Sequence, residues 1–172
     1  MRELVDAARI RQFMRSLSQE AKAPARVYLT GGATAVLTGW RQSTLDVDIK
    51  LVPDSDALLR AIPAIKESLH LNVELAAPID FIPVRPGWED RSSFIAQEGR
   101  LSFYHFDLVA QALSKIERGH ARDREDVLEM LRRGLVDPAS LRTAFAAIEP
   151  ELYRYPAVSA AGFRRALGEL LG

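Results

Sequence analysis

The hydrophobic and polar positions alternate most regularly at residues 45–52. Because successive side chains of a strand point to opposite faces of a sheet, this alternation predicts a strand with one apolar face and one charged face. The apolar positions are Leu45, Val47, Ile49 and Leu51, and the charged positions are Asp46, Asp48 and Lys50.

A glycine pair, Gly31-Gly32, precedes this strand. It follows a short β-rich run at residues 27–29 and leads into a small apolar segment at residues 33–37, which predicts a helix that ends at Gly39. Glycines between a strand and a helix let backbone N–H groups approach a phosphate, and a helix N-terminus favours anions. The turn is therefore a candidate phosphate-binding loop.

Asp46 and Asp48 lie two residues apart on the predicted strand, with Cα atoms roughly 7 Å apart. At a separation of about 5 Å and an effective dielectric of about 20, their carboxylates repel by about 3 kcal/mol, so a cation is expected beside them. The alternative is an amphipathic strand whose polar face is simply solvated. The glycine pair favours the first interpretation, because a nucleoside triphosphate site needs both a phosphate-binding turn and metal-binding carboxylates.

The segments Gly31-Gly32, Arg41-Gln42-Ser43-Thr44 and Asp46-Val47-Asp48 together resemble the signature of the DNA polymerase beta-like nucleotidyltransferase superfamily. Within it, the Arg41-x-x-Thr44-x-Asp46-x-Asp48 pattern is similar to bacterial nucleotidyltransferase-like proteins related to abortive-infection toxins, several of which belong to toxin–antitoxin pairs. The resemblance extends over residues 27–133. It implies an α+β fold, with a small mixed β-sheet core, flanking helices and a C-terminal helical subdomain.

The resemblance also implies an activity, the Mg²⁺- or Mn²⁺-dependent transfer of a nucleoside monophosphate from an NTP to an RNA, protein or small-molecule acceptor, with a cognate antitoxin as a further partner. Gly31, Gly32 and Thr34 would hold the triphosphate, and Arg41 and Thr44 would contact the nucleotide or orient the substrate. Asp46 and Asp48 would bind the metal. The alternative is a catalytically inactive relative with a binding or regulatory role, because Ala33 follows the glycines where serine is usual.

Asp80 is the candidate for a third catalytic and metal-binding acid. It lies in a β-rich run, Ile79-Asp80-Phe81-Ile82, where the superfamily commonly places such a residue. Asp80 could instead cap the turn after Pro78, and Glu74 is the substitute candidate.

Further along the chain, Lys115 and the Arg122-Asp123-x-x-Asp126 segment look like the Lys and Arg-Asp-x-x-Asp motif of the same toxin-like proteins. There the lysine contacts triphosphate, and the arginine and aspartates complete the nucleotide pocket. The alternative is the mixed charge pattern of an ordinary solvated helix surface.

The remaining elements follow from periodicity and from turn residues. Pro63 predicts a kink or break near Ala61, and residues 83–99 predict an irregular loop. Helices are expected at residues 2–20, 54–69, 107–119, 121–133, 138–148 and after 159, and further strands at 71–75, 79–84 and 101–106. We expect a nucleotidyltransferase-like core at residues 1–105 and a helical subdomain packed on it at residues 106–172.

The amino-acid composition excludes some kinds of site and partner. The 172 residues contain 23 Lys and Arg, 23 Asp and Glu, and no cysteine, so there is no global positive charge for duplex nucleic acid and no disulfide or thiolate metal site. The N-terminus lacks the pattern of a secretory leader, and no window is apolar enough for a membrane span. These features predict a cytoplasmic protein without membrane contact.

Overall fold

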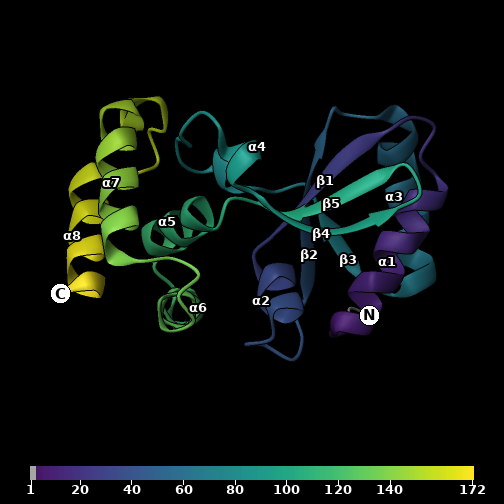
Figure 1. The fold of residues 1–172 in the computed structure, drawn as a ribbon, viewed down its shortest axis with the longest axis horizontal. Helices are drawn as coiled ribbons and strands as arrows, with labels where there is room; N and C mark the ends of the chain where they lie inside the picture. Colours follow the sequence, from purple (N-terminus) through teal and green to yellow (C-terminus); the bar gives the residue numbers. More distant parts are fainter. Residues whose placement is uncertain (1–2) are drawn as a thin grey trace. The chain divides into compact units, whose positions relative to one another are not determined.

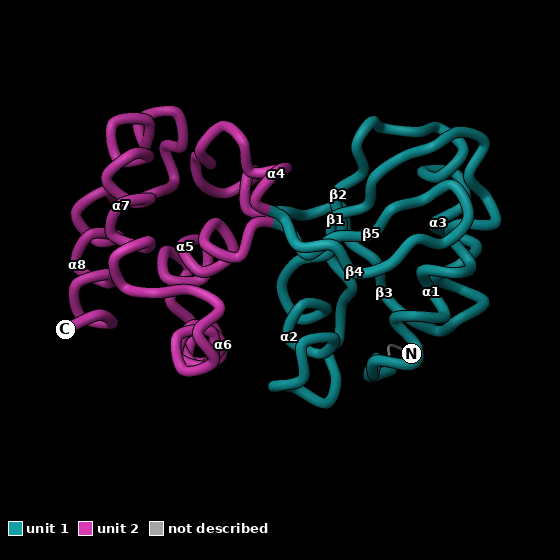
Figure 2. Tube along the Cα trace, viewed as in Figure 1, with its two compact units in different colours: residues 1–77, 92–106 teal, residues 78–91, 107–172 magenta. Residues whose placement is uncertain are grey.

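The computed structural model describes residues 3–172 and divides into two compact units (Figure 2). Unit 1 comprises Met1–Ala77 and Ser92–Phe106, and unit 2 comprises Pro78–Arg91 and Asp107–Gly172. Besides the C-terminal helices, unit 2 therefore contains Pro78–Arg91, a segment expected from the sequence to lie in the core.

Unit 1 contains a five-stranded mixed sheet in the order β3-β2-β1-β5-β4, which confirms the α+β class (Figure 1). Strand β1 pairs antiparallel with β2 and parallel with β5, β2 pairs parallel with β3, and β4 pairs antiparallel with β5. The strands are β1 (Ala25–Thr30), β2 (Asp46–Val52), β3 (Asn72–Glu74), β4 (Ser93–Glu98) and β5 (Leu101–His105).

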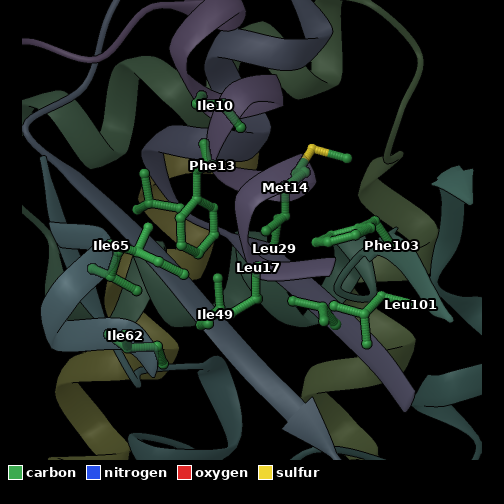
Figure 3. Packing of buried hydrophobic residues seen from close by; sticks show 14 of the residues in the cluster. Ile10, Phe13, Met14, Leu17, Leu29, Ile49, Ile62, Ile65, Leu101 and Phe103 are labelled. Atoms are coloured by element: carbon green, nitrogen blue, oxygen red, sulfur yellow. The ribbon is translucent and has the colours of Figure 1, made fainter. Parts of the chain in front are cut away.

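One face of this sheet packs against helices to form the core of unit 1. The helices of this unit are α1 (Ala7–Gln19), α2 (Gly32–Thr38) and α3 (Asp56–Leu69). Full burial of a large aliphatic or aromatic side chain contributes about 1.5–3 kcal/mol. Figure 3 shows the side chains that meet there, from α1 (Ile10, Phe13, Met14, Leu17), α3 (Ile62, Ile65) and the strands (Leu29, Ile49, Leu101, Phe103).

Strand β2 has the two faces that its sequence predicts. Val47 and Ile49 are at most 1% exposed and join the core, whereas Asp46 and Asp48 are half-buried on the opposite face. Leu45 is an exception, because it precedes the strand and is 48% exposed. The core therefore fixes which face of β2 carries the carboxylates.

Four sequence expectations about local structure differ from the structure. Helix α3 continues through Pro63 without a break, since burial of Leu58, Ile62 and Ile65 on the core outweighs the lost hydrogen bond. The loop expected at residues 83–99 contains helix α4 (Trp88–Arg91) and strand β4.

The third difference is the strand expected at residues 79–84, where a 3₁₀ turn, η1 (Pro78–Asp80), occurs instead. Fourth, the helix expected at residues 2–20 begins only at Ala7, because Val5 forms a β-bridge with Thr44. Its proposed start, Arg2, lies outside the described residues.

Unit 2 consists of helices. Helix α5 contacts α6, α7 and α8, and Phe145 of α7 meets Phe163 of α8 edge-on, with ring centroids 4.8 Å apart. The four predicted helices are confirmed as α5 (Leu108–Arg118), α6 (Ala121–Arg132), α7 (Pro138–Ile148) and α8 (Ala160–Leu171), with the 3₁₀ helix η2 (Glu149–Arg154) before the last. Across residues 3–172, every helix is too short or too polar to cross a membrane.

Candidate functional site

The polar face of β2 continues onto β3. The two strands are parallel, and their register pairs Asp46 with Asn72 and Asp48 with Glu74. Because residues at paired positions point to the same side of a sheet, three carboxylates and one amide share the face opposite the core. The acidic side chains on this face thus come from both β2 and β3, whereas the sequence indicated acidic residues on β2 alone.

Asn72 connects two of these carboxylates. Its Nδ2 donates a hydrogen bond to Oδ1 of Asp46 at 2.7 Å and another to Oε1 of Glu74 at 3.1 Å. The residue is 8% exposed, so its amide is held among protein groups. Asn72 was not among the residues predicted from the sequence. Its available signal was the i, i+2 spacing with Glu74, which repeats the spacing of Asp46 and Asp48.

The backbone of the glycine turn lies next to the carboxylate of Asp48. Gly31 has φ +63°, and a Cβ there would lie 2.9 Å from Oδ2 of Asp48. A Cβ on Gly32 would lie 2.0 Å from Oγ1 of Thr44. Both positions therefore require glycine, which brings the backbone of the turn beside Asp48.

Thr44 and Arg41 complete this part of the site. Thr44 is 7% exposed, its hydroxyl donates to the carbonyl oxygen of Asp46 at 3.1 Å, and its backbone pairs with Val5. Arg41 approaches from the same side, since a Cβ on Gly32 would lie 3.5 Å from its Nη1. The structure thus brings the Gly-Gly, Arg-x-x-Thr and Asp-x-Asp segments together in unit 1.

Thr34 lies in the first turn of α2, two residues after Gly32, and its side chain contacts β5. Its side chain is 1% exposed, and Oγ1 lies 3.0 Å from Nδ1 of His105 on β5. Burial, and to a lesser extent the positive charge of Arg11, lowers the pKa of His105 to about 4, so this imidazole is neutral at pH 7. A triphosphate contact by Thr34 remains a prediction.

Asp80 belongs to unit 2, where it ends the η1 turn and is exposed. Its expected strand is absent, whereas Glu74, the substitute candidate, lies beside Asp48 on β3. Within unit 1, the structure therefore places Glu74 with the two aspartates, and the role of Asp80 stays a prediction.

The second motif forms a buried ion cluster in unit 2. Nζ of Lys115 lies 2.7 Å from Oδ2 of Asp126 and 3.8 Å from Oδ1 of Asp123, and Arg118 donates two hydrogen bonds to Asp123. Both aspartates are 1% exposed. The neighbouring Arg122 is exposed on α6.

Two opposing effects act on Asp123. Burial alone would raise the pKa of its carboxyl, but the hydrogen bond and charge of Arg118, the charge of Lys115 and the backbone N–H of His120 together lower that pKa below its ordinary value. Asp123 is therefore ionised at neutral pH and joins α5 to α6.

The carboxylates of unit 1 are chemically suited to Mg²⁺. In residues 3–172, no group of three or more His, Cys, Asp or Glu side chains is arranged to hold a metal by itself. Magnesium prefers oxygen ligands and is usually held by one or two carboxylates together with water and substrate phosphates. Asp46 and Asp48, with the Gly31 backbone beside them, provide such a partial ligand set.

An α+β core with an acidic sheet face beside a glycine turn is the architecture expected of a nucleotidyltransferase. The model of a family described as "Nucleotidyltransferase of unknown function (DUF6036)" matches residues 6–159, and the chain belongs to this family. No curated protein and no solved structure matches the chain. Family membership supports nucleotidyl transfer in general and a nucleotide as substrate.

Proposed function

We propose that this protein transfers a nucleoside monophosphate from an NTP to an acceptor in a reaction that depends on Mg²⁺ or Mn²⁺. The main support for the proposal is the location of Asp46, Asp48 and Glu74 on one sheet face beside Gly31. A phosphate-binding backbone next to a carboxylate group matches the needs of phosphoryl chemistry.

In the proposed reaction, an acceptor oxygen attacks the α-phosphorus of the NTP, and a new P–O bond forms while the bond to the pyrophosphate oxygen breaks. Asp46 and Asp48 would hold the divalent ion, which supplies charge stabilisation for the phosphates. The backbone at Gly31 and Gly32 would contact the triphosphate, and Arg41 would orient the substrate.

A third carboxylate would take the proton of the acceptor hydroxyl as a general base. Glu74 is favoured for this role, because β3 places it in register with Asp48. Asp80 is the other candidate. Glu74→Gln and Asp80→Asn therefore separate the two, since only the variant of the true base would lose most of the transfer rate.

In unit 2, the resemblance supports Lys115 and Arg122 as groups that offset phosphate charge, with Asp123 and Asp126 completing the nucleotide pocket. Lys115 is already paired with Asp126, so Arg122, exposed on α6, is the cation more accessible to a ligand. Arg122→Ala should raise the KM for NTP without unfolding the protein.

The direct test is incubation with each α-labelled NTP, Mg²⁺ and total RNA, protein or metabolite extract. Wild type should label one acceptor class, and Asp48→Asn should not. Asp54→Asn is the matched control, because Asp54 is an exposed aspartate that precedes helix α3. Absence of label with all four NTPs would contradict the proposal.

A toxin role is the biological form of this proposal that the abortive-infection resemblance supports. Expression of wild type should stop bacterial growth, and a cognate antitoxin should restore it. Expression of Asp48→Asn should leave growth unchanged. Equal arrest by both forms would show that arrest does not depend on transfer.

A second candidate is a catalytically inactive binding or regulatory protein. It is favoured by Ala33 after the glycine pair and by the lack, within residues 3–172, of a complete metal-ligand group. It predicts NTP binding that Asp46→Ala leaves unchanged and no label transfer, whereas the enzyme requires Asp46 for both.

A further inference from the structure

We infer that Asn72 is a positioning residue that holds Asp46, a ligand of the divalent ion, in a fixed orientation next to Glu74, the favoured general base. This inference rests on the proposed function. It concerns a residue that acts through the carboxylates and does not itself contact the reacting atoms.

The geometry of the amide carries the inference. A side-chain amide has two N–H donors on one nitrogen, and Nδ2 of Asn72 lies 2.7 Å from Asp46 Oδ1 and 3.1 Å from Glu74 Oε1. Asn72 is thus shared between a carboxylate on β2 and another on β3. The parallel register places Asn72 directly opposite Asp46, so the first bond follows from the strand pairing. Glu74 is two residues further along β3, so the second bond follows from the two-residue period of a strand.

The chemistry of the amide explains why asparagine suits this position. A lysine or arginine here would neutralise the carboxylates and compete with a metal ion. A leucine would leave them adjacent with no donor between them. The amide orients both carboxylates and leaves their negative charge in place, as expected for a residue that supports metal ligands from behind.

The test is Mn²⁺ affinity, measured by titration calorimetry on the full chain, together with the Mg²⁺ dependence of transfer. Asn72→Leu removes both donors at similar volume and should weaken Mn²⁺ binding about 10–100-fold. The apparent KM for Mg²⁺ should rise by the same factor, with a smaller change in the KM for NTP. Asn72→Ser keeps one donor and should fall between wild type and Asn72→Leu.

Gln97→Leu is the matched control. Gln97 is also a strand amide, on β4, where its Nε2 donates to the Gly99 carbonyl and its Oε1 accepts from Ser102. Its replacement removes comparable hydrogen bonds from another strand and should leave Mn²⁺ affinity unchanged.

The outcomes are distinct. If wild type binds Mn²⁺ and transfers label while folded Asn72→Leu binds Mn²⁺ equally well, the inference fails and the proposed function stands. If wild type binds no Mn²⁺ with or without NTP, both fail. If Asn72→Leu does not fold, Asn72→Ser decides, and unchanged Mn²⁺ affinity in that variant overturns the inference.

Discussion

The two acidic motifs of this protein both consist of aspartates, but their hydrogen-bonding partners differ in charge. In unit 2, Asp123 and Asp126 are one helical turn apart, almost fully buried and paired with Lys115 and Arg118. In unit 1, Asp46 and Asp48 are two residues apart on a strand, half-buried, and Asp46 is bound by the uncharged amide of Asn72.

The difference suggests separate roles: carboxylates paired with cations stabilise the fold, whereas carboxylates held by an uncharged amide can bind a metal ion. The aspartates of unit 2 are paired with two cations, and these ion pairs join α5 and α6. Asn72 organises its carboxylates without neutralising them, which leaves negative charge for a metal ion. A buried charge that loses its partner is costly, whereas removal of one of several repelling carboxylates is tolerated.

The largest expected effect is on catalysis in unit 1. Asp46→Asn should reduce nucleotidyl transfer on the order of 10³-fold, about 4 kcal/mol of transition-state stabilisation, because a metal ligand is lost. The midpoint of urea unfolding should change little, because one repulsive charge is removed. If Asp46→Asn instead failed to fold, Asp46 would have the same stabilising role as the aspartates of unit 2, which would contradict this comparison.

In unit 2 the expected effect falls on stability. Lys115→Met leaves Asp126 and Asp123 buried without their shared lysine and should lower the free energy of unfolding by about 3 kcal/mol, measured in urea. The double variant Lys115→Met/Asp126→Leu should recover most of this loss. If Lys115→Met is stable but no longer binds NTP, then Lys115 is the phosphate contact that the resemblance implies.

Replacement of Gly31 should be destabilising for two separate reasons. Gly31→Ala combines the cost of φ +63° with a contact of 2.9 Å to Asp48, and should lower stability by about 1–3 kcal/mol and reduce transfer. Gly39→Ala is the control, because Gly39 has φ +108° but no atom within 4 Å of an added Cβ. A lower transfer rate in Gly31→Ala alone would locate the effect at Asp48.

The smallest expected effects concern pH. The pKa of His105 is lowered from 6.5 to about 4 in the folded state, so the unfolded chain binds a proton first as the pH falls. Stability should decrease by about 1–2 kcal/mol between pH 7 and pH 5. His105→Gln should remove this decrease, as followed by thermal unfolding at each pH; an unchanged pH profile would contradict the assignment.

Asp123 should act in a different pH range. Its pKa is lowered from 3.8 by its cationic partners, so its stabilising contribution is fully present above pH 3.8 and is lost as the pH falls through the folded-state pKa. Asp123→Asn should therefore flatten the acid end of the stability profile and leave the range from pH 5 to 7 unaffected.

Much of this architecture could be predicted because the relevant signals are local. The alternation of Val47 and Ile49 with the aspartates identified β2, and the Gly-Gly pair marked the turn. Periodicity and capping residues identified the helices of unit 2. Local signals failed at Pro63, where packing on the core overrides propensity, and at β4, whose mixed pattern resembled a loop.

The partners of the carboxylates could not be predicted in this way. Pairing between β2 and β3 is a non-local property, and a shift of one residue would turn Asn72 and Glu74 to the other face. From the sequence, Asp80 and Glu74 were therefore alternatives for the third acid, and only the i, i+2 spacing with Glu74 pointed to Asn72. Likewise, the burial of Lys115 between two aspartates depends on how α5 packs against α6.

Metal binding by Asp46 and Asp48 is tested most directly by anomalous X-ray scattering from crystals grown with Mn²⁺ and a non-hydrolysable NTP analogue. We expect manganese density bounded by the carboxylates of Asp46 and Asp48, with the triphosphate beside Gly31. Crystals that hold the analogue but show no manganese at these carboxylates, or that place the metal at Asp123 and Asp126, would contradict this expectation.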